Sequence, residues 1–351
     1  MTGEQRSRVP GPAVLAGLGT GVAVAALTGI AAAGKLLGLR GAGEDPVGPD
    51  DLDFRSDRET IVMSADGVPL HVREVGPRDA ATTVVFIHGF TLRSASWVLV
   101  LRELRARWGD DVRMVFPDCR GHGDSGACTP RQSTVGLLGD DIATVLQALV
   151  PTGPVVLVGH SMGGMAICGF ATGHPELIGT RVVGASLLGT ASHALTDSGL
   201  AAALRNPVLD VFRVAVRFLP SVVGRGREAV RPFAEPFVTA GAYGPGDHSA
   251  SLAHFSSSMS LSAPLGTYAG FIPALETYDE QAALPVLRRI ECSVVCGDHD
   301  RMTPLRKSEV LAEELDCEFV VLSDTGHMLI LEAAPRVARS VADLVERAVR
   351  R

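Results

Sequence analysis

Residues 154–164 read Pro-Val-Val-Leu-Val-Gly-His-Ser-Met-Gly-Gly, and they predict a strand that turns directly into a helix. An apolar run stops abruptly at Gly159, and small residues then open a segment, 165–172, that we expect to be helical. A strand that turns so sharply into a helix strains the residue at the bend and exposes its side chain, and flanking glycines let the backbone pack closely there. The pattern therefore predicts a nucleophile elbow with Ser161 at its tip.

Length and composition narrow the classes of protein to which the chain can belong. The 351 residues suffice for one large domain or two, and the formal net charge of −7 argues against a nucleic-acid-binding surface. The six cysteines form no CxxC pair and have no metal-finger spacing. We therefore expect a globular protein with no nucleic-acid partner, no metal and no organic cofactor.

The N-terminal part, residues 1–40, is unusual for a soluble enzyme. An uncharged run rich in Ala, Gly, Val and Leu spans residues 9–34, which is long enough to cross a bilayer, since a transmembrane helix needs about 20 residues. Three interpretations stay open: a membrane anchor, a cleaved export signal, or a weakly ordered leader on a cytoplasmic protein. Residues 41–58 follow, and their Gly, Pro and Asp content predicts a flexible linker.

From residue 59 onward, apolar strands alternate with segments of helical periodicity. Such alternation predicts an α/β fold in which a mostly parallel sheet is covered by helices on both faces. The alternation is interrupted over 191–285, where eight prolines and short helical patches predict an inserted helical cap. The core would then comprise 59–190 and 286–351. We expect strands at 60–63, 70–74, 83–87, 112–116, 155–158, 182–188, 292–296 and 318–322, and helices at 97–108, 135–149, 304–315 and 337–348.

A serine hydroxyl needs a base to become nucleophilic, and the base needs a carboxylate to orient it. Two later loops supply candidates, each directly after an expected strand: Asp298 and Asp300 in one, His327 in the other. Because the carboxyl ends of parallel strands open on one edge of a sheet, Ser161 and these loops would share a rim. The chain order Ser, Asp, His differs from the order in the chymotrypsin and subtilisin types.

Five motifs occur in order, and together they give the chain from about residue 59 onward its resemblance to the α/β-hydrolase superfamily. They are His88-Gly89-Phe90, the run Asp118 to Ser125, the elbow around Ser161, Gly297-x-x-Asp300 with Pro304, and Gly326-His327 followed by Glu332 and Pro335.

The resemblance assigns a role to each candidate. Ser161 would attack an acyl carbonyl, His327 would carry the proton, and Asp300, third after the glycine, would orient the imidazole in preference to Asp298. Backbone N–H groups of Phe90 and Met162 would form the oxyanion hole. The resemblance makes His88, His122 and His160 framework residues that order the loops around the site.

Serine at the elbow points to acyl transfer to water, whereas dehalogenase-like and epoxide-hydrolase-like relatives carry Asp there. We therefore expect an esterase- or lipase-like hydrolase acting on small-molecule or lipid carboxylic esters. Carbon–carbon bond hydrolase, thioesterase and haloperoxidase-like activities remain alternatives on the same triad, and a silent hydrolase-fold binding protein is the non-enzyme alternative. Six phenylalanines of the cap suggest an apolar pocket: Phe212, Phe218, Phe233, Phe237, Phe255 and Phe271.

Overall fold

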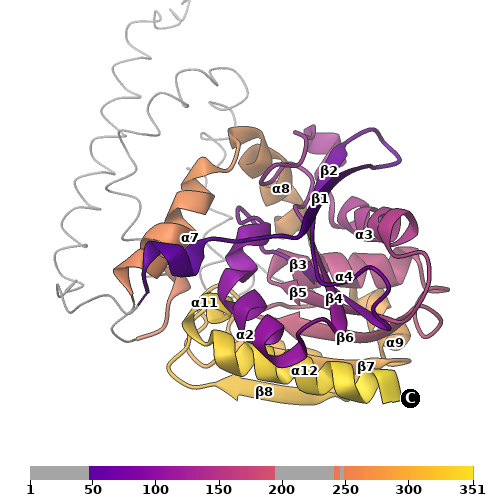
Figure 1. The fold of residues 1–351 in the computed structure, drawn as a ribbon. Helices are drawn as coiled ribbons and strands as arrows, with labels where there is room; N and C mark the ends of the chain where they lie inside the picture. Colours follow the sequence, from indigo (N-terminus) through magenta and orange to yellow (C-terminus); the bar gives the residue numbers. More distant parts are fainter. Residues whose placement is uncertain (1–46, 194–240, 246–248, 351) are drawn as a thin grey trace, which may run out of the picture.

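The computed structural model describes residues 47–193, 241–245 and 249–350, and its centre is an eight-stranded sheet (Figure 1). The strand order is β1-β2-β4-β3-β5-β6-β7-β8. The strands are β1 (Arg58–Met63), β2 (Pro69–Val75), β3 (Thr82–Ile87), β4 (Val112–Pro117), β5 (Val155–His160), β6 (Val182–Leu188), β7 (Glu291–Gly297) and β8 (Glu318–Leu322). All eight expected strands are present at these places.

The sheet is antiparallel at one end and parallel over the rest. The hairpin β1–β2 and the pair β2–β4 are antiparallel, whereas every later neighbouring pair, from β4–β3 to β7–β8, is parallel. Every residue of β3, β4 and β5 is buried, as expected for strands that are covered on both faces. The parallel strands therefore end together at one edge, which receives the loops of the candidate site.

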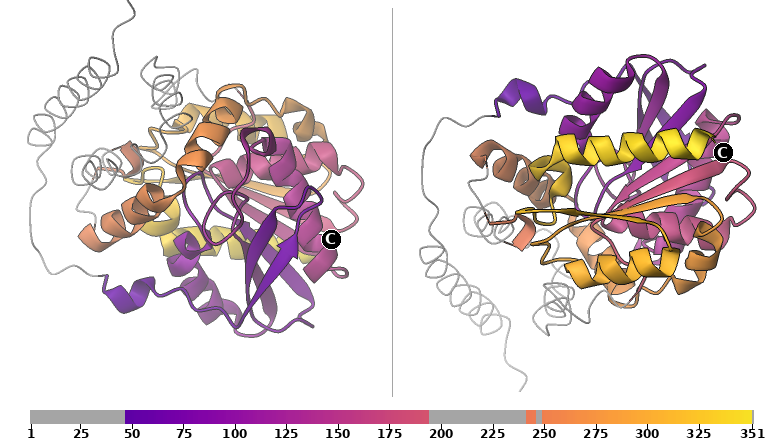
Figure 2. Two further views of the ribbon diagram at one scale, coloured as in Figure 1. Left: turned by 90° about the horizontal axis from the view of Figure 1, so that it is seen from above. Right: turned by 90° about the horizontal axis from the view of Figure 1, so that it is seen from below.

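Helices cover both faces of the sheet, as the sequence predicted. They are α2 (Val98–Trp108), α3 (Val135–Leu149), α4 (Met162–Gly173), α9 (Leu284–Leu287), α10 (Leu305–Leu315), α11 (Leu329–Glu332) and α12 (Ala334–Arg350). Buried side chains of α3, α4, α9 and α10 form one core cluster, and those of α2, α11 and α12 form the other. Figure 2 shows α12, in yellow, lying along one face of the sheet.

The turn from β5 into α4 has the strained geometry that the sequence predicted. Ser161 has φ 53° and ψ −117°, which a non-glycine residue rarely adopts. A side chain at Gly163 would place its Cβ 2.1 Å from the Ile87 carbonyl oxygen, so only glycine allows β3 and α4 to approach this closely. Helix α4 begins at Met162, three residues before the expected start, because the bend is completed at Ser161 alone.

The predicted cap, 191–285, is described only in part, since residues 194–240 and 246–248 lie outside the described residues. The part that is described contains helices α7 (Ala250–Ser262) and α8 (Leu265–Glu276) and a short 3-10 helix, η6 (Gln281–Ala283). Helix α8 is fixed to the body because the Thr267 hydroxyl donates to the Gly121 carbonyl oxygen. This contact places α8 over the loop that follows β4.

The apolar run 9–34 lies outside the described residues, as does the beginning of the predicted linker. Within the described ranges, none of the helices combines the length and apolar character needed to span a membrane. The described end of the predicted flexible linker 41–58 is packed rather than free. Residues 49–52 form the 3-10 helix η1, the carboxylate of Asp51 pairs with Arg102 at 2.5 Å, and the ring of Phe54 packs edge-on against Phe116 at 5.1 Å.

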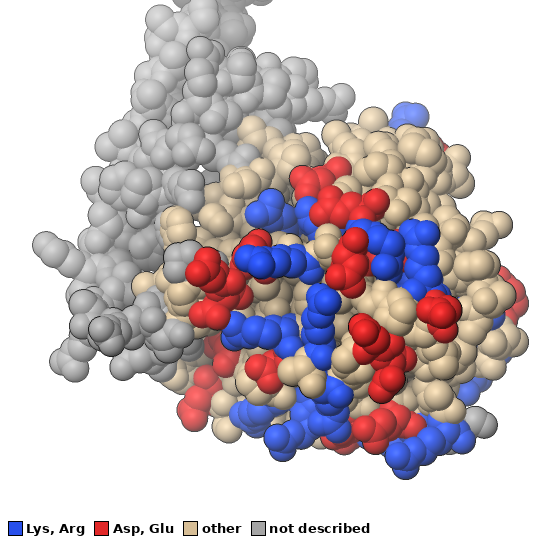
Figure 3. Space-filling view, viewed as in Figure 1, with Lys and Arg blue, Asp and Glu red and all other residues tan. Residues whose placement is uncertain are grey.

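Charged side chains of both signs are interspersed over the face of the molecule shown in Figure 3. Exposed ion pairs of the molecule include Arg306 with Glu309 at 3.3 Å and Arg350 with Glu346 at 3.5 Å. Exposed pairs of this kind contribute at most about 1 kcal/mol each to stability. The fold therefore depends chiefly on its two apolar clusters.

Candidate active site

Three loops at the carboxyl ends of β5, β7 and β8 bring Ser161, Asp300 and His327 together. The Oγ atom of Ser161 lies 2.9 Å from Nε2 of His327, and Nδ1 of His327 lies 2.8 Å from Oδ2 of Asp300. In this chain of contacts the serine hydroxyl donates to Nε2 and the Nδ1–H group donates to the carboxylate. The three side chains thus have the geometry of a nucleophile, a base and an orienting acid.

The carboxylate of Asp300 is held by hydrogen bonds on both oxygens. Oδ1 accepts the backbone N–H groups of Met302 and Thr303 at 2.8 Å each, and Oδ2 accepts the Thr303 hydroxyl at 2.8 Å besides the imidazole. Burial by itself raises the pKa of Asp300, but the charge of His327 and these hydrogen bonds outweigh it, so the pKa lies below its ordinary value. The acid therefore stays ionised and fixed in orientation.

Thr303 is a contributor that the sequence analysis did not single out. A signal for it exists, because an Asp side chain in a turn commonly accepts backbone N–H groups a few residues on, and a Thr at that place can add its hydroxyl as a donor. The second candidate acid, Asp298, does not contact the imidazole of His327. It accepts the Thr325 backbone N–H at 3.2 Å and pairs with His299 at 2.7 Å, and so joins the two loops that carry Asp300 and His327.

The other three histidines of the motifs are buried and hydrogen-bonded to backbone. His160 Nε2 lies 2.8 Å from the carbonyl oxygen of His327, His88 Nε2 accepts the Cys119 N–H at 2.9 Å, and His122 Nδ1 lies 2.9 Å from the Arg120 carbonyl oxygen. Complete burial lowers the pKa of His122 and of His160 to about 3. Both imidazoles are therefore neutral at pH 7, which suits framework positions.

The backbone around Ser161 offers N–H groups on two sides. A Cβ at Gly89 would lie 3.2 Å from Cβ of Ser161, so the loop after β3 passes directly beside this serine. In the part of the chain that the structure describes, nothing accepts a hydrogen bond from the next N–H, that of Phe90. Met162 heads α4, where the first N–H groups have no partner within the helix. Both expected oxyanion donors thus belong to segments that flank Ser161.

Aromatic rings from the cap cover the Phe90 side chain. Tyr268 and Phe271 of α8 lie 5.5 Å and 6.4 Å from it, between ring centroids, and Phe271 also lies 5.4 Å from His122. Phe255 packs at the edge of a core cluster. The other four cap phenylalanines of the predicted pocket, 212, 218, 233 and 237, lie outside the described residues. The described part of the cap therefore presents an apolar surface beside the expected oxyanion loop.

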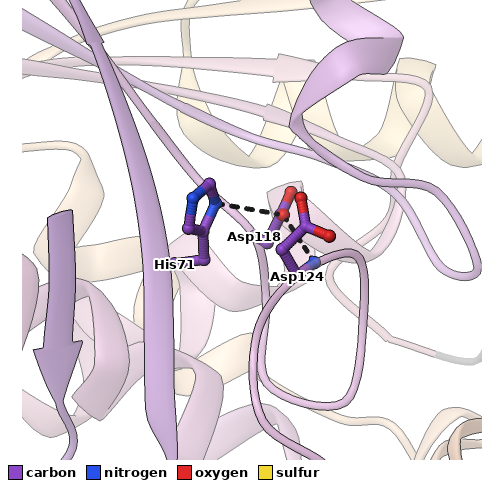
Figure 4. A group of neighbouring side chains, drawn as sticks. All are labelled: His71, Asp118 and Asp124. Atoms are coloured by element: carbon purple, nitrogen blue, oxygen red, sulfur yellow. Dashed lines mark hydrogen bonds and ion pairs between the residues drawn. The ribbon is translucent and has the colours of Figure 1, made fainter. Parts of the chain in front are cut away.

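A second polar cluster lies away from the triad, where His71 of β2 faces Asp118 and Asp124 (Figure 4). Asp118 accepts the N–H groups of Ser94 at 2.6 Å and of Asp124 at 2.9 Å, and Arg73 pairs with the Asp124 carboxylate at 2.7 Å. The guanidinium of Arg73 therefore already pairs with the Asp124 carboxylate, which a metal cation would need as a ligand. The cluster braces the loop after β4, which carries His122.

Comparison with known proteins shows the family to which the chain belongs. The chain is 34% identical over 124 residues to a Bacillus subtilis protein named as a 2-succinyl-6-hydroxy-2,4-cyclohexadiene-1-carboxylate synthase, covering 35% of this chain and 42% of that protein. It is 32% identical over 119 residues to lipase LipV of Mycobacterium tuberculosis, covering 33% and 41%. The match therefore spans less than half of either relative.

A solved structure extends the likeness to most of the chain. A thermophilic esterase from Thermogutta terrifontis superimposes with a TM-score of 0.66 at 24% identity, over 83% of this chain and 99% of that one. At this identity the likeness concerns the fold alone. The sequence model of the alpha/beta hydrolase family matches residues 84–340, a range that includes Ser161, Asp300 and His327. The chain therefore belongs to the alpha/beta hydrolase family.

Proposed function

We propose that this enzyme is a serine hydrolase that cleaves carboxylic esters through an acyl-enzyme intermediate, with Ser161, Asp300 and His327 as its catalytic triad. The observation that carries the proposal is the unbroken line of contacts from the serine Oγ, through the imidazole at 2.9 Å, to the carboxylate at 2.8 Å. Each step is within hydrogen-bond distance without any rearrangement.

In the first half-reaction, Oγ of Ser161 attacks the acyl carbon while Nε2 of His327 takes its proton. The carbonyl oxygen becomes an oxyanion, which the N–H groups of Phe90 and Met162 stabilise. When the intermediate collapses, the bond between the acyl carbon and the alcohol oxygen breaks, and His327 gives its proton to that oxygen. Water then repeats the sequence on the acyl-enzyme and releases the acid.

Two features support this chemistry over a silent binding protein. The carboxylate of Asp300 is saturated with hydrogen bonds, so it stabilises the imidazolium that forms in each half-reaction. The strained backbone at Ser161 is the second feature, since strain of this kind persists where the surrounding structure enforces it, as at an elbow that presents a nucleophile. A binding protein needs neither.

The test is a substrate panel measured with the wild-type chain and with Ser161→Ala. It contains p-nitrophenyl esters of increasing chain length, an acyl-CoA thioester and a 2-hydroxy-6-oxo-dienoate. We expect the wild-type chain to hydrolyse the esters with a higher kcat/KM than the other two substrate classes. Ser161→Ala should hydrolyse none of them. Preference for the thioester or for carbon–carbon cleavage would replace the ester assignment, and no turnover of any member would favour a binding role.

We also propose, from the sequence alone, that the apolar run 9–34 attaches the enzyme to a membrane. Fractionation of cells that express the full chain, or a chain starting at Gly41, tests this directly. The full chain should sediment with membranes and the shorter chain should not. Recovery of the full chain in the soluble fraction would contradict the proposal.

A further inference from the structure

The loop that carries His327 is bonded to residues 241–245, a short described stretch of the cap that precedes α7. The N–H of Met328, the residue after the base, donates to the Ala242 carbonyl oxygen at 3.0 Å. The N–H of Gly326, the residue before the base, donates to the carboxylate of Glu332, at 3.1 Å and 3.0 Å from its two oxygens. The same carboxylate accepts the Gly244 N–H at 2.8 Å. Glu332 thus joins the two segments.

The two segments touch backbone to backbone. A Cβ at Gly326 would lie 2.4 Å from the Gly244 nitrogen, and a Cβ at Gly244 would lie 2.6 Å from the Asp324 carbonyl oxygen. On the other side, a Cβ at Gly297 would lie 2.2 Å from the Thr325 carbonyl oxygen. The loop that carries His327 is therefore enclosed between the end of β7 and residues 241–245 of the cap, with no room for a side chain at Gly297, Gly326 or Gly244.

We propose that Glu332 is a positioning residue for His327: its carboxylate locks the base loop to the cap, so that the cap sets where the imidazole lies. The catalytic effect of Glu332 rests on the proposed function. Its hydrogen bonds to the loop and to the cap do not depend on that function. Among the described residues, the Glu332 carboxylate bonds none of the triad side chains, and it reaches the base through the Gly326 N–H, one residue before His327.

The consequence for catalysis follows from geometry. A carboxylate that accepts two N–H groups holds them more strongly than a neutral acceptor does. Without it, the Gly244 and Gly326 N–H groups lose their shared partner, and the loop can move away from Ser161. A displacement of 1 Å at a reacting group costs up to about 100-fold in rate.

The kinetic test compares Glu332→Ala and Glu332→Gln with Glu313→Ala, a control on α10 whose side chain is 70% exposed. All rates are divided by the concentration of active sites titrated with a fluorophosphonate. We expect kcat per titrated site to fall about 30- to 100-fold in Glu332→Ala, with KM changed less than about threefold, because the base and not the binding surface has moved. Glu332→Gln should recover part of kcat, since its amide oxygen can still accept both N–H groups. Unchanged kcat per titrated site in Glu332→Ala would mean that Glu332 serves stability alone.

Hydrogen exchange by NMR or mass spectrometry gives a readout that needs no activity. In Glu332→Ala, the amides of Gly244 and Gly326 should exchange at least about tenfold faster, because they lose their acceptor. If the two segments form one unit, the Met328 amide should also exchange faster, although its own acceptor, the Ala242 carbonyl oxygen, is unchanged. Protection that is unchanged at all three amides would refute the lock even if the ester assignment stands. If exchange is faster in Glu332→Ala but the wild-type chain hydrolyses no ester, the result supports the role of Glu332 in holding the loop and refutes the proposed function.

Discussion

Replacing Asp300 by Asn should nearly abolish turnover while leaving the fold intact. The backbone N–H groups of Met302 and Thr303 both point at Oδ1, so the asparagine must keep its carbonyl oxygen there. Its NH₂ group then takes the place of Oδ2, which lies 2.8 Å from Nδ1 of His327. The amide donates to Nδ1, which forces the imidazole into the tautomer with hydrogen on Nε2. That nitrogen can no longer accept the serine proton.

The expected loss is about 10⁴-fold in kcat at pH 7, by analogy with the same substitution in another Ser-His-Asp triad. A factor of that size corresponds to about 5.5 kcal/mol of transition-state stabilisation. The assay is p-nitrophenyl ester hydrolysis per folded protein, with circular dichroism to check the fold. Asp298→Asn is the matched control, because its carbonyl oxygen can still accept the Thr325 N–H, and its activity should stay within about tenfold of wild type. If Asp300→Asn retained a tenth of wild-type activity, the role of Asp300 would be wrong.

Two further predictions concern stability. Gly163→Ala would place a Cβ 2.1 Å from the Ile87 carbonyl oxygen, so urea denaturation should show a loss of about 3 kcal/mol, and a loss under 1 kcal/mol would contradict the close approach. The buried imidazoles of His122 and His160 have pKa values of about 3. As the pH falls below about 6.5, these two histidines take up protons only in the unfolded chain. Each of them should therefore lower the free energy of unfolding by about 2 kcal/mol at pH 5. His71, whose pKa a neighbouring carboxylate raises, offsets part of this loss, and equal stability at pH 7.5 and 5.0 would contradict the burial of the two neutral imidazoles.

The sequence predicted the sheet and the arrangement of the three loops because those features follow from local patterns. Apolar runs mark strands that are buried on both faces, and the rule that parallel strands end at one edge is enough to bring Ser161 near His327. The same holds for the elbow, since Gly-x-Ser-x-Gly after an apolar run has few conformations open to it. The strand and helix positions followed with shifts of a few residues.

Contacts between distant segments could not be predicted in this way. Glu332 and Gly244 are 88 residues apart in the chain, and no periodicity or motif relates them. The packing of Phe54 against Phe116 was missed because a stretch rich in Gly, Pro and Asp is typical of linkers, and its one aromatic ring carries no periodic signal. Such contacts depend on which surfaces meet after folding, and that is a property of the whole chain.

In the proposed mechanism, the hydroxyl of Ser161 is a nucleophile that the imidazole of His327 activates. Incubation with a fluorophosphonate, followed by peptide mass spectrometry, tests this nucleophile without any choice of substrate. We expect one phosphonate per chain, on Ser161, with no labelling of Ser161→Ala and strongly slowed labelling of His327→Ala. An unlabelled wild-type chain of intact fold, or a label carried by another serine, would contradict it.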